Sequence, residues 1–455
     1  MTDKMRICMI FYDMQEFGGL EEYATTLAVG LRQQGHAVSA LSTAWITPDN
    51  QYLTRLRHND IPVTQLPKWL SLTLSDWKTK HRILAVLMLL LSPLTYLLAM
   101  GLFFVKRRTW RASVMSAYGW LHGLLLDHLI GPDRRKPFAR LLLEWQRLRW
   151  RPDVLHIQGY TSSLLFVIEW AHAKRITVVY EEHQTPDAQF DWWQDFQHSI
   201  NKADRVLAVS EKSAEALRSV CGVTRPIIVR NPLLPDPFVS GWSKPPRATQ
   251  QHSLFVTTVA RLYVTKGLSY LLEAIVLVRE KHPLTEFRVY GDGPMRAELL
   301  TYARQLGLDG DRIFVGAFTS REALSQIMSE TDIFVMSSVL EGQPLGVVEA
   351  MAYGCPIVTT AVGGIAELIS DGANGLLCPP RDPACLARNI CLLIEDAALR
   401  ASLGHEARQA YLHGSYQPSA VCSHIASVYR DAVSERRSAV SRASMVEQTT
   451  VSPER

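Results

Sequence analysis

The chain has 455 residues, of which 47% are hydrophobic and 20% charged, with a formal net charge of +4. This is the composition of a globular protein, and the length exceeds one ordinary core, so we expect two domains. Seven scattered cysteines without CxxC spacing argue against a disulfide framework and a zinc site, and indicate a reducing compartment. No signal peptide is visible, because a short polar start leads directly into an apolar strand.

The first half of the chain alternates strands with helices. Helical spacing over 20–34 follows the pair Gly18-Gly19, and Gly35-His36 closes that helix. Short apolar runs predict strands at 6–11, 37–41, 61–66, 154–158, 177–180 and 205–209. Alternation of this kind predicts a parallel, doubly wound sheet.

A linker then separates a second set of the same elements. Residues 225–248 contain six prolines. Beyond them we expect strands at 254–259, 286–290, 313–315, 333–337 and 356–360, and helices at 267–280 and after Gly293. We therefore expect an N-terminal domain over 1–232 and a C-terminal domain over 253–412. Open α/β sheets bind ligands at the carboxyl ends of their strands, so two such domains would face a cleft.

The end of the chain changes character. We expect a helix over 413–433 that packs back on the first domain. From about 434 to 455, Ser, Arg, Glu and Gln replace the apolar pattern, which predicts a disordered tail.

The sharpest cluster of polar residues follows the strand at 333–337. Glu341 would lie in a loop, Pro344 in the first turn of a helix, and Glu349 inside that helix. Backbone N–H groups around Gln343–Gly346 would then face the cleft and suit a diphosphate or sugar hydroxyls. Two glutamates eight residues apart also fit an ordinary helix that carries a solvated acid and a capping acid.

A basic pair precedes the helix at 267–280. Arg261 and Lys266 flank a strand-to-helix loop, and Gly267 opens the helix. A guanidinium fork and a compact ammonium would together neutralise a diphosphate leaving group without a metal. The plainer reading is two surface cations near the start of a helix.

These motifs together resemble the retaining GT-B glycosyltransferases of family four (glycosyl transferases group 1). The individual motifs are weak, but their order and spacing are specific, and the resemblance covers the chain except 68–150 and the tail. It rests on Gly18-Gly19, Gly35-His36, Pro152-Asp153-Val-Leu-His156, Ser210, Asn231-Pro232, Arg261, Lys266-Gly267, Gly291-Asp-Gly293-Pro294, Glu341, Glu349 with Ala350-Met-Ala-x-Gly354-x-Pro356, and Gly363-Gly364 with Glu367.

The resemblance implies a fold and a set of roles. Two Rossmann-like domains would face a cleft in which Arg261 and Lys266 hold the donor diphosphate. Glu341 would bind the sugar and Glu349 the ribose. The remaining expected binding residues are Gln343, Pro344 and Leu345 at the helix start, Gly18 and Gly19 at the phosphates or acceptor, and Gly291, Gly293 and Phe318 at the base.

The first domain contributes one further expected site residue. His183 follows the strand at 177–180, where the family often places a histidine at the sugar. The family more often has His followed by Asp, whereas this chain has Glu181-Glu182-His183-Gln184.

No metal or other cofactor is expected. Asp309-Gly-Asp311 resembles the Asp-x-Asp metal motif of the other large transferase fold, but it lies ahead of a strand start and away from the cleft elements. We interpret it as turn chemistry. The nucleotide-sugar would be a co-substrate.

An unusual insertion lies between 68 and 150. Residues 83–105 carry no charge, and six of the eleven tryptophans fall between 68 and 151. The same segment has fifteen Lys or Arg against four Asp or Glu. An apolar run with basic and aromatic flanks is typical of a membrane interface with anionic lipids. Because both ends of the insertion enter one sheet, a single span is excluded; a helical hairpin packed on the first domain is the alternative.

We therefore expect a membrane-associated hexosyl- or related glycosyltransferase at the cytoplasmic face, peripheral or monotopic. It would transfer a sugar, with retention, to a lipid-linked or cell-envelope glycan acceptor. The alternatives are a nucleotide-sugar epimerase on the same fold and a catalytically silent, membrane-associated sugar-binding subunit. Nucleic-acid binding is not expected, because long apolar runs interrupt the basic segment.

Overall fold

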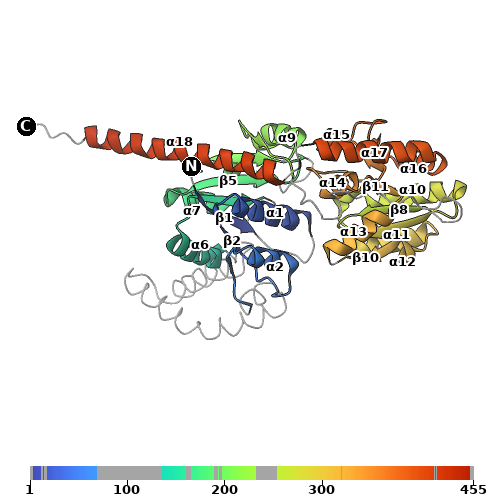
Figure 1. Cartoon of the computed structure of the whole chain (residues 1–455), viewed down its shortest axis with the longest axis horizontal. Coiled ribbons are helices and arrows are strands. Elements are labelled where there is room, and N and C mark those ends of the chain that lie inside the picture. Colours follow the sequence, from blue (N-terminus) through green and yellow to red (C-terminus); the bar gives the residue numbers. More distant parts are fainter. Residues whose placement is uncertain are drawn as a thin grey trace, which may run out of the picture.

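The computed structural model describes residues 4–11, 14, 18–68, 136–159, 165–188, 193, 197–231, 254–318, 320–414, 416 and 418–450. These residues form two α/β domains that lie side by side (Figure 1). Each domain is built on a fully parallel sheet, as the alternation of strands and helices predicts.

The first domain has a seven-stranded sheet in the order β3-β2-β1-β4-β5-β6-β7. Its strands are β1 (Arg6–Phe11), β2 (Ala37–Ser42), β3 (Val63–Gln65), β4 (Val154–Gln158), β5 (Thr177–Glu182), β6 (Arg205–Ala208) and β7 (Ile227–Ile228). Its helices are α1 (Gly19–Gln33), α2 (Gln51–His58), α6 (Lys136–Trp150), α7 (Phe166–Ala173), α8 (Gln197–Ile200) and α9 (Glu211–Cys221). One apolar cluster joins the sheet to α1 and α2, and another joins it to α6, α7 and α9, so both faces are covered.

The second domain has six strands in the order β10-β9-β8-β11-β12-β13. They are β8 (Phe255–Val259), β9 (Glu286–Tyr290), β10 (Phe314–Gly316), β11 (Ile333–Met336), β12 (Ile357–Thr360) and β13 (Leu376–Cys378). The helices are η3 (Val264–Lys266), α10 (Leu268–Lys281), α11 (Arg296–Gln305), α12 (Gly310–Ile313), α13 (Arg321–Glu330), α14 (Leu345–Ala352), α15 (Ile365–Leu368), α16 (Pro383–Glu395) and α17 (Ala397–His413). Ser320, Asp382 and Asp396 cap α13, α16 and α17 with their side chains, which explains where these helices begin.

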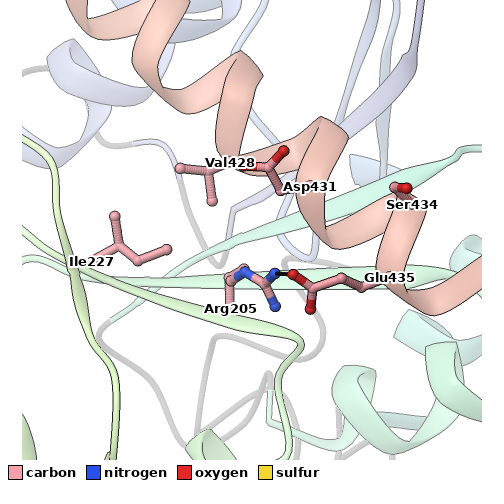
Figure 2. A pocket seen from close by; sticks show the side chains of 6 residues that line it. All are labelled: Arg205, Ile227, Val428, Asp431, Ser434 and Glu435. Carbon is pink, nitrogen blue, oxygen red and sulfur yellow. Dashed lines mark hydrogen bonds and ion pairs between the residues drawn. The ribbon is translucent and has the colours of Figure 1, made fainter. Parts of the chain in front are cut away.

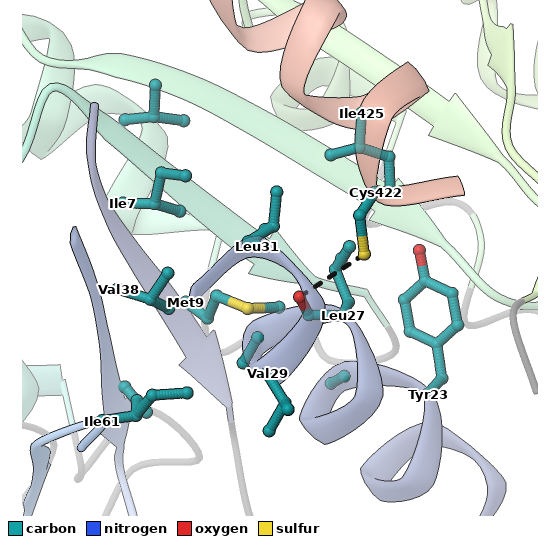
Figure 3. Close-up of a cluster of buried hydrophobic side chains, with 14 of the residues drawn as sticks. Ile7, Met9, Tyr23, Leu27, Val29, Leu31, Val38, Ile61, Cys422 and Ile425 are labelled. Carbon is teal, nitrogen blue, oxygen red and sulfur yellow. Dashed lines mark hydrogen bonds between the residues drawn. The ribbon is translucent and has the colours of Figure 1, made fainter. Parts of the chain in front are cut away.

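The last helix, α18 (Pro418–Thr450), returns across the first domain and projects beyond it (Figure 1). Cys422 and Ile425 of α18 pack on α1 (Figure 3), where Gly30 allows the approach, because a Cβ there would lie 2.4 Å from the Cys422 sulfur. Figure 2 shows α18 above the edge of the sheet, with Glu435 2.6 Å from Arg205.

The helical end corrects the expectation of a disordered tail from 434. The structure continues α18 to Thr450. Arg205 binds Glu435, and Arg436 lies 2.7 Å from Asp204, so polar residues past 433 still contact the first domain. The loss of apolar periodicity marks a helix that leaves the core, and Ala, Arg, Glu and Met in it are good helix formers.

The structure also corrects the C-terminal boundary of the expected insertion. Residues 136–150 form α6, which packs on the sheet: Ala139 and Leu143 are buried, and Gln146 donates to the Ser39 hydroxyl at 2.8 Å. This segment is therefore part of the domain body, where an insertion to 150 was expected. The apolar run 83–105 lies outside the described residues. Within the described part of the chain, no helix is both long enough and apolar enough to cross a membrane.

Candidate active site

A cleft of about 540 Å³ lies between the two domains, at the carboxyl ends of β1 and β8. Residues of both domains form its walls. Ten of the residues expected from the sequence line it: Gly18, Gly19, Arg261, Lys266, Gly291, Gly293, Phe318, Pro344, Leu345 and Glu349. Glu341, Gln343 and His183 are not among the described residues that line it. The cleft therefore unites segments that are more than 300 residues apart in the sequence.

Two glycines allow the loop after β9 to approach the loop after β8. Gly291 has φ +144°, and a Cβ there would lie 1.9 Å from the Ala260 carbonyl oxygen. At Gly293 the added carbon would lie 2.6 Å from the Leu262 carbonyl oxygen. Only glycine fits these positions, which leave the backbone open toward the cleft.

Lys266 and Glu341 form an ion pair beside the cleft. The Lys266 Nζ lies 2.5 Å from Glu341 Oε1, and Ser338 donates its hydroxyl to the same oxygen at 2.7 Å. Gly267, at φ +57°, lets this loop close on the end of β11, since a Cβ would lie 2.3 Å from the Ser337 carbonyl oxygen. Glu341 thus reaches the cleft through Lys266, which retains two further N–H donors.

Arg261 meets an acid of the opposite domain. Its guanidinium lies 3.6 Å from Glu21 Oε1, in the first turn of α1. A Cβ at Gly18 would collide with both the Glu21 carboxylate and the Arg261 guanidinium, so the glycine allows this pair to form. Negative charge in the first turn of a helix is favourable in itself. The charge of Arg261 is therefore balanced by an acid across the domain boundary.

A second ion-pair chain crosses the cleft through Arg321. Its guanidinium lies 3.5 Å from Glu349 and 3.7 Å from Glu22 of α1. Glu22 is also bound by Arg55 at 3.0 Å. Burial raises the pKa of Glu349 to about 7, against the opposing effect of Arg321, and Glu22 adds to the rise. Glu349 is thus a carboxyl group whose charge changes near neutral pH.

The start of α14 differs by one residue from the expectation. Pro344 is the N-cap, with ψ 122°, and the helix begins at Leu345. Pro344 has no N–H, so the expected run of donors is interrupted. Gln343 lies against the linker: its side-chain oxygen accepts from the Asn231 backbone N–H at 2.6 Å, and its carbonyl accepts from the Asn231 side chain at 2.7 Å. Leu345 and Gly346, in the first turn of α14, line the cleft, and N–H groups at this end of a helix have no acceptor within the helix.

His183 lies at the domain boundary. Its backbone carbonyl is so close to Gly342 that a Cβ there would lie 2.1 Å from it, which places His183 beside the loop that carries Glu341. Its Nε2 lies 2.8 Å from the side-chain oxygen of Gln158. Burial lowers the pKa of His183 to about 4, although Glu181 opposes this shift, so the imidazole is neutral at pH 7.

Several site residues were missed from the sequence. Glu21 and Glu22 directly follow Gly18-Gly19, and this adjacency was a signal that could have found them. Arg321 follows a helix cap and had no comparable signal. As for the expected turn residues, Asp309 caps α12 and accepts from the Arg312 N–H at 3.3 Å.

Comparison with known families supports the resemblance to glycosyltransferases that the sequence motifs indicate. The model of glycosyl transferases group 1 matches 243–410, and that of glycosyltransferase family 4 matches 116–232. An uncharacterized glycosyltransferase of Methanocaldococcus jannaschii is 30% identical over 186 residues, 40% of this chain and 46% of the relative. Glycogen synthase of Mycobacterium tuberculosis is 26% identical, with 66% of this chain and 73% of the relative covered. A putative colanic acid biosynthesis glycosyltransferase of Escherichia coli is 28% identical, with 63% and 69% covered.

Solved structures show the same fold. HepE of Anabaena, in complex with UDP-glucose, has a TM-score of 0.65 at 20% identity and covers 94% of this chain and 100% of its own. Sucrose-phosphate synthase of Thermosynechococcus elongatus has a TM-score of 0.66 at 17% identity, with 94% and 99% covered. The two family models match successive parts of the chain, one in each domain. This chain belongs to the glycosyltransferases of the GT-B fold.

Proposed function

We propose that this chain transfers a sugar from a nucleotide-diphosphate donor to a lipid-linked or cell-envelope glycan, with retention of the anomeric configuration. The observation that carries the proposal is the composition of the cleft. Two cations, Arg261 and Lys266, stand beside the start of α14 and the acid Glu349, between two Rossmann-like domains. The phosphates and the ribose each have a group of matching chemistry in the cleft, and Glu341, which contacts Lys266, lies beside the cleft for the sugar.

The donor diphosphate would lie between Arg261 and Lys266. The guanidinium would exchange its 3.6 Å contact with Glu21 for phosphate oxygens, which is favourable because charge-assisted hydrogen bonds to phosphate are strong. Glu349 would accept the ribose hydroxyls, and Gly291, Gly293 and Phe318 would surround the base. The complexes of the HepE neighbour with UDP and with UDP-glucose support a donor of this kind.

The sugar would lie between Glu341 and His183. Glu341 would accept hydrogen bonds from sugar hydroxyls, while its contact with Lys266 holds the carboxylate in place. The acceptor oxygen bonds to the anomeric carbon on the face from which the diphosphate oxygen leaves, and the acceptor proton passes to that leaving oxygen. The two cations stabilise the departing diphosphate, so this scheme requires no metal.

The acceptor side would face a membrane. On α6, Leu141, Trp145 and Leu148 are 68%, 56% and 65% exposed, and their spacing places them on one face of the helix. Arg147 and Arg149 lie in its last turn. An apolar face with basic neighbours suits the surface of an anionic bilayer. We place the protein at the cytoplasmic face, and the names of relatives in colanic acid and amylovoran biosynthesis support an envelope glycan.

A donor panel tests the proposed activity. The intact chain is incubated with radiolabelled nucleotide-sugars and a membrane lipid extract, and label is counted in the organic and aqueous phases. We expect one donor to label the organic phase, and Arg261→Ala to abolish the signal while the exposed Arg312→Ala retains it. Anomeric coupling constants in NMR spectra of the product report retention. No transfer from any donor, or equal activity in Arg261→Ala, would refute the proposal.

Vesicle flotation tests the membrane surface. Vesicles of phosphatidylglycerol with phosphatidylcholine are compared with phosphatidylcholine alone. We expect binding to the anionic vesicles, weakened in a variant with Leu141, Trp145 and Leu148 all changed to serine. The matched control changes the exposed Leu284 and Leu412 of the second domain to serine. Equal flotation of the two variants would remove α6 from the membrane surface.

A further inference from the structure

A group of buried polar side chains connects the C-terminal helix α18 to His183. Tyr23 of α1, His156 and Gln158 of β4, Glu181 of β5 and Tyr429 of α18 are each no more than 2% exposed. Burying so many polar groups costs free energy unless each finds a partner. The partner of each of these side chains is therefore described in turn below.

One end of the group is a tyrosine–histidine–carboxylate row. The Tyr429 hydroxyl lies 2.6 Å from His156 Nδ1, and His156 Nε2 lies 3.1 Å from Glu181 Oε2. Tyr23 donates its hydroxyl to Glu181 Oε1 at 2.5 Å. Although burial raises it, the contacts with His156, His183 and Tyr23 keep the pKa of Glu181 below its ordinary value. The 3.1 Å contact of His156 Nε2 with Glu181 lies outside hydrogen-bond geometry, so it is electrostatic, and a carboxylate there favours a proton on Nε2.

The other end of the group reaches His183 along two routes. The Gln158 side-chain nitrogen lies 3.3 Å and 3.4 Å from the two ring nitrogens of His156, and its oxygen lies 2.8 Å from His183 Nε2. The Tyr23 ring meets the His183 ring edge-on, with centroids 4.6 Å apart. Since an amide oxygen only accepts, His183 donates from Nε2, which leaves its Nδ1 as an acceptor.

The hydroxyl of Tyr429 is not needed to dock α18. Val421, Cys422, Ile425 and Val428 already bury the apolar face of this helix in the core of the first domain (Figure 3). A phenylalanine would fill the same volume without bringing a polar atom into a fully buried position. The hydroxyl instead holds His156 at its second nitrogen, and this fixes the ring that supports both Glu181 and Gln158.

We propose that Tyr429 is a positioning residue for His183, acting through His156, Glu181 and Gln158, so that the returning C-terminal helix completes the sugar site of the first domain. This inference rests on the proposed function in which His183 contacts the sugar. Helix α18, which follows the second domain in the chain, thereby sets the orientation and the tautomer of His183 in the first domain.

Histidine NMR tests the network without any substrate. The full chain, labelled with ¹⁵N-histidine, is compared as wild type, Tyr429→Phe and Ile425→Val, and the His183 signals are identified from His183→Ala. We expect His183 to be a neutral Nε2–H tautomer in the wild type and a mixture of tautomers in Tyr429→Phe. Ile425→Val removes one methylene from the same helix and should leave the His183 signals unchanged. Identical His183 signals in Tyr429→Phe and the wild type would overturn the proposal.

A double-mutant cycle separates the two proposals. With the donor that the panel identifies, Tyr429→Phe should lower kcat by about tenfold, the ratio that corresponds to one hydrogen bond, with the donor KM unchanged. In the His183→Ala background the same change should have no further effect. Multiplying effects would show that Tyr429 acts independently and overturn its positioning role. Wild-type turnover of His183→Ala would instead refute the proposed role of His183, while the NMR result would stand.

Discussion

The second domain lines the cleft with charges of both signs, whereas Glu22 is the only charged residue that the described part of the first domain contributes to the lining. Arg261, Lys266 and Glu349 line the cleft directly. In the first domain, His156 and Glu181 are fully buried, and in our proposal they affect the site only through His183. In the proposed function, the second-domain wall contacts the charged donor, and the first-domain wall holds the neutral imidazole of His183, whose pKa is lowered to about 4, in one orientation.

The largest effect is expected from Glu341→Ala, because it removes the carboxylate that holds Lys266 at 2.5 Å. The variant loses the sugar contact and frees the lysine at the same time. We expect kcat to fall by about 10² to 10³. Initial rates under donor saturation measure this, and thermal unfolding checks that the fold is retained.

The control for this change is Glu322→Ala in the first turn of α13, which should retain full activity. A Glu341→Ala enzyme with wild-type turnover would show that the second-domain wall does not bind the sugar through this acid.

Lys266→Ala should weaken the binding of the donor more than it slows the chemical step. One charge-assisted contact to phosphate is lost, so we expect the dissociation constant of the donor to rise by about ten- to a hundredfold. Titration calorimetry with the donor measures it, and Lys281→Ala, an exposed lysine at the end of α10, is the matched control. An unchanged affinity would contradict the diphosphate role.

The site residues of the second-domain wall can be predicted from the sequence more easily than those of the first-domain wall. Arg261, Lys266 and Glu341 lie between a strand and the helix that follows it, and Glu349 lies within such a helix, α14. The pattern predicts the strands well, and the observed β9 and β4 have the predicted bounds. Their positions follow from local order, since each lies in the connection between one strand and the next. Contacts made within one βα unit leave a local signature of this kind.

The first-domain wall lacks such a signature. The observed β5 runs to Glu182, past the predicted end at 180, because two acidic residues do not read as buried strand. Their burial depends on partners such as Tyr429, which is 273 residues from His156 in the sequence. Only the fold brings these groups together, so no spacing rule finds them. The same holds for Arg321, which meets Glu22 across the cleft.

A smaller effect is expected from pH, because Glu349 has its pKa raised to about 7. The ionised carboxylate is the better acceptor for ribose hydroxyls, so donor affinity should rise as the pH increases through 7 and fall below it. Titrations of the nucleotide-sugar between pH 6 and 8 measure this, as its diphosphate does not ionise in that range. We expect a change of up to about tenfold.

Two variants sharpen this comparison. Arg321 favours the charged form of Glu349, so Arg321→Met should shift the midpoint to higher pH, whereas Glu349→Gln should remove the dependence. Glu22 faces the Arg321 guanidinium and is itself bound by Arg55, and both residues are unchanged in the two variants. A pH dependence that persists in Glu349→Gln would assign the titration to another group.

The smallest effect is expected from a chelator. In the proposed scheme Arg261 and Lys266 neutralise the leaving diphosphate, so a divalent cation has no charge left to balance there. Rates measured with EDTA should equal those measured with magnesium, once the affinity of the donor for magnesium in solution is taken into account. A strict loss of activity in EDTA would mean that the two cations do not suffice, and that the ion pair of Arg261 with Glu21 persists when the donor binds. The first-domain acids would then take part in binding the donor, and the proposed difference in function between the two walls would be wrong.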